Sequence, residues 1–303
     1  MDSTTAANDS FPSARLPGWM LLLCVVAGLA GIFDRDLWTP DEPRVAAISL
    51  EMSRTQNYMV PHLAGEAFVE QPPLYYAVAA AFAGRLGPLV GETGAIRFTS
   101  ALWGLATLLV VFLMARRLLG RNPALFAAAM LATMGGFVEN AHWIRVDMAL
   151  LFFVSAALWS LCEVYVGDRP WHLPLAGLFA AGAFLVKGPV GPLFIGLGGL
   201  GLFVPWAVRR VREKTGGPLF VLHHVLCLAA FAVVVGVWMA AFRKVGGPEL
   251  WHQWFWDNQF GRFSGTAVHL GHVKSREPFY YLGTVASRTL PWLPLVLLWI
   301  AGV

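Results

Sequence analysis

The sequence has little charge for its length. Of its 303 residues, 13% are Asp, Glu, Lys or Arg, whereas 57% are hydrophobic. A soluble domain carries roughly 25% charged residues, so this composition excludes an ordinary soluble domain. Apolar stretches of span length predict instead an all-α protein, a bundle of helices that crosses a membrane several times.

Cysteine is also scarce. The three cysteines, Cys24, Cys162 and Cys227, all lie within apolar segments. An odd number of cysteines in such positions argues against a disulfide framework and against a metal site built from thiolates. We expect the three to behave as small hydrophobic side chains.

Several functional signatures are missing. The sequence contains no Walker loop, no glycine-rich nucleotide fingerprint after a strand and no Gly-x-Ser-x-Gly elbow. Its 22 Lys and Arg residues are scattered among loops, which disfavours nucleic-acid binding. Anionic lipid headgroups or phosphates suit such cations better. An activated substrate would therefore have to arrive in the membrane.

A helix needs about 20 apolar residues to span a bilayer. About eight segments meet this requirement: Leu16–Phe33, Phe98–Ala115, Pro123–Ala141, Met148–Val166, Trp171–Val186, Pro189–Val208, Leu219–Phe242 and Tyr280–Val303. A ninth, Leu74–Val90, is interrupted by Arg85. If it lies along the membrane surface, the basic clusters at residues 116–121 and 209–214 share the cytoplasmic side, as the positive-inside rule favours.

Two long polar segments separate these spans. We expect residues 34–97 to form a first outer loop with interfacial helices, and residues 243–279 to form a second long outer loop. The whole chain, 1–303, is expected to be one transmembrane module. Its last apolar segment reaches Val303 without a polar flank, which predicts a chain truncated at its C-terminus.

The first loop begins with two adjacent carboxylates, Asp41 and Glu42, followed by Arg44. Ionisable groups beside a bilayer are costly and are by default functional candidates. Asp41 could simply cap a short helix over Glu42–Arg54. Alternatively, one carboxylate faces a pocket as the general base for an acceptor, while the other pairs with Arg44.

Further charged residues follow at the ends of the predicted spans. Asp147 could cap a helix and pair with Arg145, or it could be a second carboxylate facing Asp41, with Arg145 bound to phosphate through its rigid fork. Lys187 lies between apolar runs and either snorkels or contacts phosphate. Residues 251–263 form an aromatic belt that contains Arg262, a candidate anion ligand.

A metal site has weaker support. Glu70 precedes Pro72 and Pro73, which fix an extended segment, so it could be an oxygen ligand of a divalent ion, a substrate contact or a solvated glutamate. His269 and His272 could also bind a metal, but their spacing matches no strong metal signature.

An ordered set of motifs runs from Leu16 to Trp292. Its members are Trp38-x-Pro40-Asp41-Glu42-x-Arg44, Glu51-Met52, Pro61-x-Leu63-x-Gly65, Glu70-x-Pro72-Pro73-Leu74, Arg145-x-Asp147, Lys187-Gly188-Pro189, Asn258-x-x-Gly261-Arg262-Phe263 and His272…Pro278-x-Tyr280-Tyr281. The set resembles the bacterial lipid A aminoarabinose transferases and their protein O-mannosyltransferase relatives. Each motif is weak singly, whereas the ordered set is strong.

The resemblance implies a glycosyltransferase of the GT-C architecture in the inner (plasma) membrane, with its active site facing the periplasm. The implied donor is a sugar linked to polyprenyl phosphate, and the acceptor is lipid A, a protein or a cell-envelope glycan. Asp41 is then the catalytic carboxylate and Asp147 a supporting one. Lys187 and Arg262 fall at lipid-phosphate contacts, and Glu70 falls at a metal-contacting position.

Two positions depart from the family pattern. Gln71 stands where lysine is usual, and Val45 stands where tyrosine is common. One phosphate cation is therefore missing, and Arg35, Arg97 or Lys274 could replace it. These differences bear on the identity of the sugar and headgroup more than on the reaction.

The expected site has three groups of residues. The catalytic carboxylates are Asp41, Glu42 and Asp147; the donor-phosphate ligands are Arg44, Arg145, Lys187 and Arg262; the ligands of a candidate divalent metal are Glu70 and His272. The competing interpretations are a carrier or transporter of polyprenyl phosphate that performs no chemistry, and an inactive fragment. The sequence shows no internal repeat of the kind common in transporters.

Overall fold

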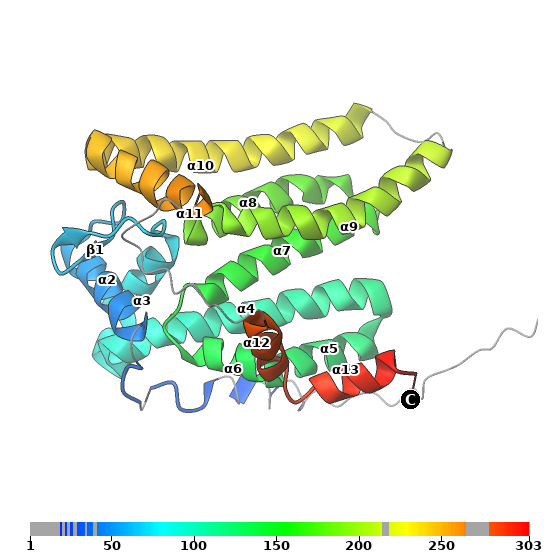
Figure 1. The fold of residues 1–303 in the computed structure, drawn as a ribbon, viewed down its shortest axis with the longest axis horizontal. Helices are drawn as coiled ribbons and strands as arrows, with labels where there is room; N and C mark the ends of the chain where they lie inside the picture. Colours follow the sequence, from blue (N-terminus) through cyan, green and yellow to red (C-terminus); the bar gives the residue numbers. More distant parts are fainter. Residues whose placement is uncertain are drawn as a thin grey trace, which may run out of the picture.

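The computed structural model describes residues 19, 22, 25, 26, 29–33, 35–38, 41–213, 218–264 and 279–302, without the side chains of residues 218, 262 and 263. Within these residues the chain is predominantly helical, as expected. Long helices lie side by side and roughly parallel, and a smaller group of short elements covers one end of them (Figure 1).

The short elements come first in the chain. They are α2 (Asp41–Thr55), a two-residue hairpin of β1 (His62–Leu63) and β2 (Glu66–Ala67), and α3 (Leu74–Val90). The hairpin is antiparallel, with His62 paired to Ala67 and Leu63 to Glu66, and it is a small departure from an all-α fold. Helix α3 has the bounds expected for the ninth apolar segment.

The bundle follows. Its elements are α4 (Glu92–Leu119), α5 (Arg121–Thr133), α6 (Gly135–His142), α7 (Asp147–Tyr165), the 3-10 turn η1 (Pro170–His172), α8 (Leu173–Lys187), α9 (Val190–Glu213), α10 (Pro218–His252), the π-helix η2 (Gln253–Phe260), α11 (Gly261–Ser264), α12 (Tyr280–Arg288) and α13 (Leu293–Ile300).

Four helical segments of the described part are long and apolar enough to cross a membrane: α4, α7, α9 and the run Leu219–Phe260. Two bent pairs, α5 with α6 at 64° and α12 with α13 at 105°, could each form one more. The described part of the chain therefore contains four to six candidate spans, and the expected total of about eight stays a prediction. Helix α8 has only 15 residues, and the expected span Leu16–Phe33 lies mostly outside the described residues.

The segment expected as a second outer loop, residues 243–279, begins as helix. Helix α10 continues past Phe242, breaks at Gly247 with a φ of 72°, and passes into η2 and α11. Glycine adopts this left-handed conformation without steric cost, and Pro248 cannot donate to the preceding turn. The break turns the chain so that Trp254, 2% exposed, packs with Trp238 in a buried aromatic cluster. Part of the expected aromatic belt is thus core.

Glycines allow the central helices to approach closely. A Cβ added to Gly177 of α8 would lie 2.1 Å from the Cys227 carbonyl oxygen of α10, and one added to Gly182 would lie 2.3 Å from the Phe153 ring of α7. Small residues are the usual means of bringing membrane helices together, because the lipid offers no hydrophobic drive for their association. These contacts fix α8 between α7 and α10.

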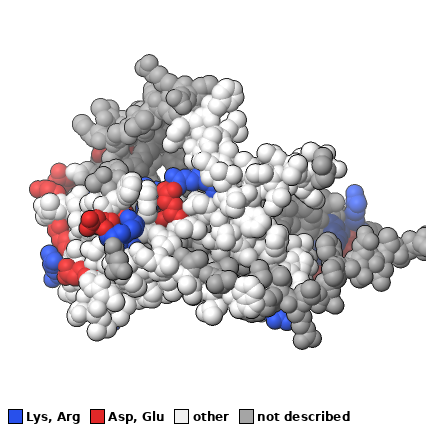
Figure 2. Space-filling model, turned by 90° about the horizontal axis from the view of Figure 1, so that it is seen from below, with Lys and Arg blue, Asp and Glu red and all other residues white. Residues whose placement is uncertain are grey.

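The ends of the bundle carry its charges. The N-termini of α4 and α7 and the C-terminus of α8 lie at the end of the molecule where α2 lies (Figure 1). On the face seen in Figure 2, acidic and basic side chains gather mainly at this end and basic ones at the other, with a largely uncharged band between. The candidate site lies at the α2 end.

We predict that Gly177→Ala destabilises the protein by about 1–3 kcal/mol, the range for overpacking a tight interior, because the new methyl group meets a backbone oxygen that cannot move away alone. Thermal unfolding of the purified protein in detergent measures the change. Gly236→Ala in α10 is the control, since an added Cβ there meets nothing within 4 Å. Equal unfolding temperatures for the two variants would contradict the close α8–α10 contact.

Candidate active site

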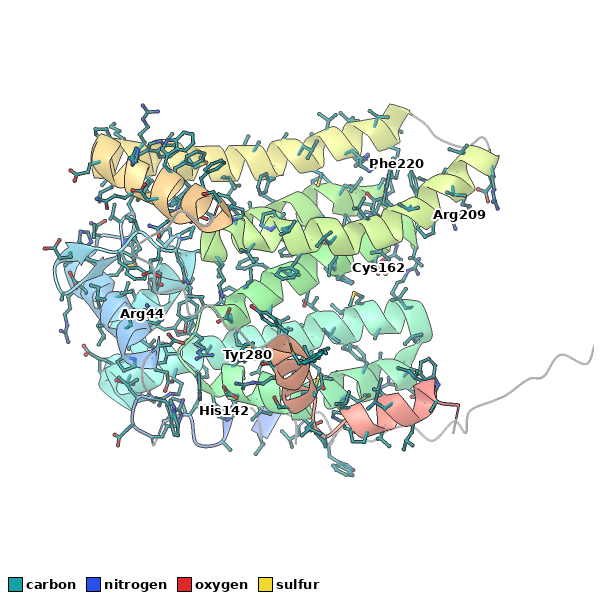
Figure 3. All side chains as sticks on the ribbon, viewed as in Figure 1. Arg44, His142, Cys162, Arg209, Phe220 and Tyr280 are labelled. Carbon is teal, nitrogen blue, oxygen red and sulfur yellow. The ribbon has the colours of Figure 1, made fainter. Side chains whose placement is uncertain are left out.

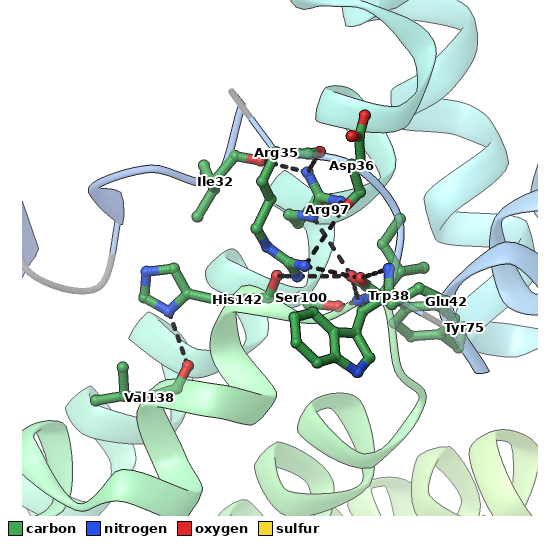
Figure 4. A network of polar contacts seen from close by, with 11 residues as sticks. Ile32, Arg35, Asp36, Trp38, Glu42, Tyr75, Arg97, Ser100, Val138 and His142 are labelled. Carbon is green, nitrogen blue, oxygen red and sulfur yellow. Dashed lines mark hydrogen bonds and ion pairs between the residues drawn. The ribbon is translucent and has the colours of Figure 1, made fainter. Parts of the chain in front are cut away.

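Glu42 is the most enclosed charge of the site. Its side chain is 0% exposed and accepts hydrogen bonds from both Nη atoms of Arg35 at 2.9 and 2.8 Å. The backbone N–H groups of Trp38 and Ile144 add bonds of 2.7 and 2.8 Å. Figure 4 shows Glu42 among Arg35, Trp38 and Arg97. Every acceptor direction of the carboxylate is therefore engaged.

Two opposing effects act on the pKa of Glu42. Burial raises the pKa. The hydrogen bonds from the Trp38 and Ile144 backbone, together with Arg35, lower the pKa by more than burial raises it, so it lies below its ordinary value of 4.5. A carboxylate that is shielded from solvent and saturated with donors cannot accept a proton from a substrate. This geometry favours a framework role for Glu42, in which the side chain positions other groups, and its expected catalytic role stays a prediction.

Arg97 supports the same network from α4. It is 0% exposed, lies 3.5 Å from Glu42 through its Nε, and donates through Nη1 to the carbonyl oxygens of Ile32 at 2.8 Å and Arg35 at 3.2 Å. Arg35 also donates to the His142 carbonyl at 2.7 Å. Both arginines are thus engaged in the framework, which disfavours either as the replacement for the lysine missing at Gln71; Lys274 lies outside the described residues.

Asp41 points in a different direction from Glu42. Consecutive helical residues point about 100° apart, so burial of Glu42 at the start of α2 directs Asp41 toward the surface, where it is 36% exposed. Its Oδ2 accepts a 2.8 Å bond from Arg145 Nη2, and its Oδ1 accepts a 3.2 Å bond from Arg44 Nη2. These three predicted site residues are therefore in direct contact.

Arg145 is held by its ring contacts as well as by Asp41. Its guanidinium lies 4.2 Å from the centroid of the Trp143 ring, and that ring stacks on Trp38. The Nε of Arg145 is buried and has no hydrogen-bond partner among the described residues. An oriented guanidinium with a spare donor can accept an anion through a two-point contact.

A pocket of about 500 Å³ opens beside Arg145. Asp147 at the start of α7 lines it, as do Asn140 of α6 and Thr284 and Arg288 of α12. These last three residues were not expected in the site, since their positions in helices of mixed polarity carry no distinct signal. Arg288 is ion-paired to Glu139, which ties α12 to α6.

Asp147 and Lys187 form an ion pair between α7 and α8. The lysine is the last residue of α8, where a cation interacts favourably with the negative end of the helix dipole. Both side chains remain partly exposed, at 42% for Asp147 and 32% for Lys187. Two residues expected on separate grounds are thus brought together and stay accessible to a ligand.

The expected metal ligands are not gathered into a site in the described part of the chain. There, no three His, Cys, Asp or Glu side chains lie close enough to hold a metal ion. Glu70 is half-buried, and its neighbour Gln71 accepts a 3.1 Å bond from the Tyr76 hydroxyl. His272 and the side chain of Arg262 lie outside the described residues.

The bundle of apolar helices with paired carboxylates, arginines and a lysine at one end is the architecture of the GT-C membrane glycosyltransferases. Residues 70–238 match the family described as dolichyl-phosphate-mannose-protein mannosyltransferase. The chain belongs to this family, and the resemblance inferred from the motifs is confirmed.

Two similar curated proteins are each named undecaprenyl phosphate-alpha-4-amino-4-deoxy-L-arabinose arabinosyl transferase. That of Aeromonas hydrophila is 31% identical over 274 residues, which are 87% of this chain and 46% of the relative. That of Edwardsiella ictaluri is 29% identical, over 93% of this chain and 50% of the relative. The chain therefore spans about half the length of these relatives.

Solved structures agree with the fold. The crystal structure of ArnT from Cupriavidus metallidurans bound to undecaprenyl phosphate superimposes with a TM-score of 0.75 at 26% identity, covering 95% of this chain and 51% of that one. The yeast protein O-mannosyltransferase Pmt1–Pmt2 complex bound to the sugar donor gives a TM-score of 0.55 at 21% identity, covering 77% and 33%. The second likeness shows the fold alone.

We predict that Glu42→Gln lowers the free energy of unfolding by about 3–5 kcal/mol, since removing one partner of a buried ion pair leaves the other charge uncompensated. The folded pKa of Glu42 is depressed, so the stability it contributes is present above about pH 4.5 and is lost as pH falls below that value. The difference in the free energy of unfolding between wild type and Glu42→Gln should therefore become smaller at acidic pH. Unfolding followed by intrinsic fluorescence between pH 7 and pH 3.5 measures both effects.

Glu92→Gln is the matched control for this experiment. Glu92 pairs with Arg54 at 3.0 Å, but the two side chains are 50% and 68% exposed, and such surface pairs contribute at most about 1 kcal/mol. If both variants lose the same stability, the Glu42 network is not the anchor described above.

Proposed function

We propose that the protein is a glycosyltransferase that moves a sugar from a polyprenyl-phosphate donor to an acceptor at the outer face of the membrane. The observation that carries the proposal is the contact of Asp41 with Arg44 and Arg145, beside a pocket that Asp147 also lines. The names of the curated relatives, and the undecaprenyl phosphate bound by the similar crystal structure, support a donor of this class.

The residues divide the chemistry between a base and a group of cations. Polyprenyl phosphate is already a fair leaving group, so the donor needs positive charge on its developing phosphate more than it needs a proton. Arg44, Arg145, Lys187 and Arg262 are the proposed phosphate ligands. Asp41 is the proposed general base, which removes a proton from the acceptor as it attacks the anomeric carbon. Direct attack inverts that centre.

The ion pairs suggest how donor binding prepares the base. Arg145 lines the pocket and is paired with Asp41, so a phosphate that enters the pocket can bind the guanidinium and draw it from Asp41. Asp41 then keeps the single contact to Arg44, at 3.2 Å, and an oxygen that is free to receive the acceptor proton. Before the donor binds, Lys187 is paired with Asp147, which lines the pocket. When the donor binds, its phosphate is a second anion with which the lysine can pair.

The membrane setting of this proposal follows the sequence analysis. The site faces the periplasm from the inner membrane, α3 lies along the membrane surface, and the complete transmembrane module has about eight spans, in the range that its apolar segments allow. The acceptor is a lipid such as lipid A, with a protein or an envelope glycan as the alternatives. The site residues and the acceptor both stand as proposals for this chain.

Asp41→Asn is expected to lower the rate of sugar transfer by roughly 10²- to 10⁴-fold, the usual contribution of a positioned general base, because the amide cannot accept the acceptor proton. The measurement uses the purified chain in lipid with labelled polyprenyl-phosphate sugars and follows both transfer and donor hydrolysis. Asp36→Asn is the control, since Asp36 is an exposed carboxylate of the preceding segment. Equal activity of wild type and Asp41→Asn overturns the role of Asp41, and donor binding without turnover in wild type favours a carrier.

Lys187→Gln should lower kcat/KM for the donor roughly 10- to 100-fold, as expected for loss of a hydrogen bond to a charged group, whereas Lys187→Arg should retain most of the activity. Steady-state kinetics with varied donor concentration provides the test, with Lys244→Gln, an exposed lysine of α10, as the control. A kcat/KM unchanged by Lys187→Gln would remove this residue from the phosphate site.

A further inference from the structure

A second basic pocket lies at the end of the bundle away from the candidate active site. Arg116, Arg117 and Arg169 line it together with Glu163, Leu113 and Trp159, around a volume of about 360 Å³. Two of the arginines belong to the last turn of α4, and Arg169 follows α7. Arg209 and Phe220 mark this end of the molecule, opposite Arg44 (Figure 3).

The pocket is lined by three guanidinium groups but by only one carboxylate. Glu163 is 8% exposed and lies 3.1 Å from Arg169 Nη1 and 3.8 Å from Arg117 Nε. Glu163 thus brings together Arg117 of α4 and Arg169, which follows α7, but its single negative charge balances only one of these two positive charges. No hydrogen bond or ion pair is found for the Arg116 side chain among the described residues, so the pocket carries an excess of positive charge.

Asp168, the neighbouring carboxylate, does not neutralise this excess positive charge. Asp168 lies in the turn after α7 with a φ of 52°, and its carboxylate is bound to Arg210 at 2.6 Å and Arg209 at 3.4 Å. It therefore compensates the arginines of α9. The preceding residue, Gly167, admits the pocket arginine closely, since a Cβ there would lie 2.8 Å from Arg117 Nη2.

The pocket is apolar on its other side. Leu113 lies one helical turn before Arg117 on α4, and Trp159 lies one turn before Glu163 on α7, so both face the same groove on the side of the helix middles. A ligand that fits has an anionic group at the helix ends and a hydrocarbon part along the helices. A phospholipid has this form, whereas free phosphate leaves the apolar wall uncovered.

We propose that this pocket binds the phosphate of an anionic phospholipid at the membrane surface opposite the candidate active site. Basic pockets between transmembrane helices bind such headgroups, and each Lys or Arg near a membrane surface contributes about 1 kcal/mol to the attraction. The lipid bridges α4 and α7, the two helices whose other ends carry Arg97 and Asp147. This site is separate from the proposed sugar-transfer chemistry and does not depend on it.

The test is native mass spectrometry of the full chain in detergent, titrated in parallel with phosphatidylglycerol, phosphatidylcholine and inorganic phosphate. Wild type is expected to retain phosphatidylglycerol in preference to phosphatidylcholine. Arg116→Gln should weaken phosphatidylglycerol binding roughly fivefold, Arg116→Glu should weaken it further, and Arg116→Lys should preserve it. The Arg116 variants should fold normally, because the side chain has no described partner to lose, and their unfolding temperatures verify this.

Arg121→Gln is the matched control. Arg121 is an exposed arginine at the same end of the bundle, two residues past α4, and it does not line the pocket, so its loss should leave phosphatidylglycerol binding unchanged. An equal loss in Arg121→Gln and Arg116→Gln would overturn the proposal in favour of diffuse surface charge. Equal retention of phosphatidylcholine, or saturation of the pocket by inorganic phosphate that blocks the lipid, would overturn it as well.

Discussion

The buried carboxylate of Glu42 is the constraint on which the candidate site depends. It collects Arg35 and the backbone N–H groups of Trp38 and Ile144, with Arg97 beside it, and thereby joins the segment before α2, the start of α4 and the connection between α6 and α7. A buried charge is tolerated only when partners compensate its lost hydration. Because the partners come from distant parts of the chain, their assembly requires the fold to be complete.

The same constraint explains how two adjacent acids acquire different roles. A helix turns successive side chains about 100° apart, so a single helical start buries Glu42 and exposes Asp41. The connection that gives Glu42 the Ile144 N–H also delivers Arg145 to Asp41. The framework bond and the accessible ion pair are thus two consequences of one contact between α2 and the α6–α7 connection.

The bundle separates its charges by distance along the helix axes. The candidate site occupies one end, the arginine pocket of α4 and α7 the other, and close glycine contacts hold the apolar middle together. Helices α4 and α7 carry residues of both ends: Arg97 and Asp147 at one, Arg116, Arg117 and Glu163 at the other. A rigid shift of one of these helices against the other would therefore change side-chain contacts at both ends.

The sequence by itself determined the class of protein, the apolar segments, the family resemblance and the positions of Asp41, Arg145, Asp147 and Lys187 in polar stretches beside the membrane. Composition and short motifs can be read directly from the sequence. A lipid environment restricts which residues can occupy membrane-spanning segments, so these features are informative. Tertiary structure decided which side chains meet: Asp41 with Arg145, Asp147 with Lys187, and Glu42 with Arg35 and Arg97. It also decided that residues 243–264 are helical and that Glu42 is buried among its hydrogen-bond partners. These outcomes depend on contacts between residues up to about one hundred positions apart, because burial, and with it the difference between a catalytic and a structural carboxylate, is a property of the folded whole.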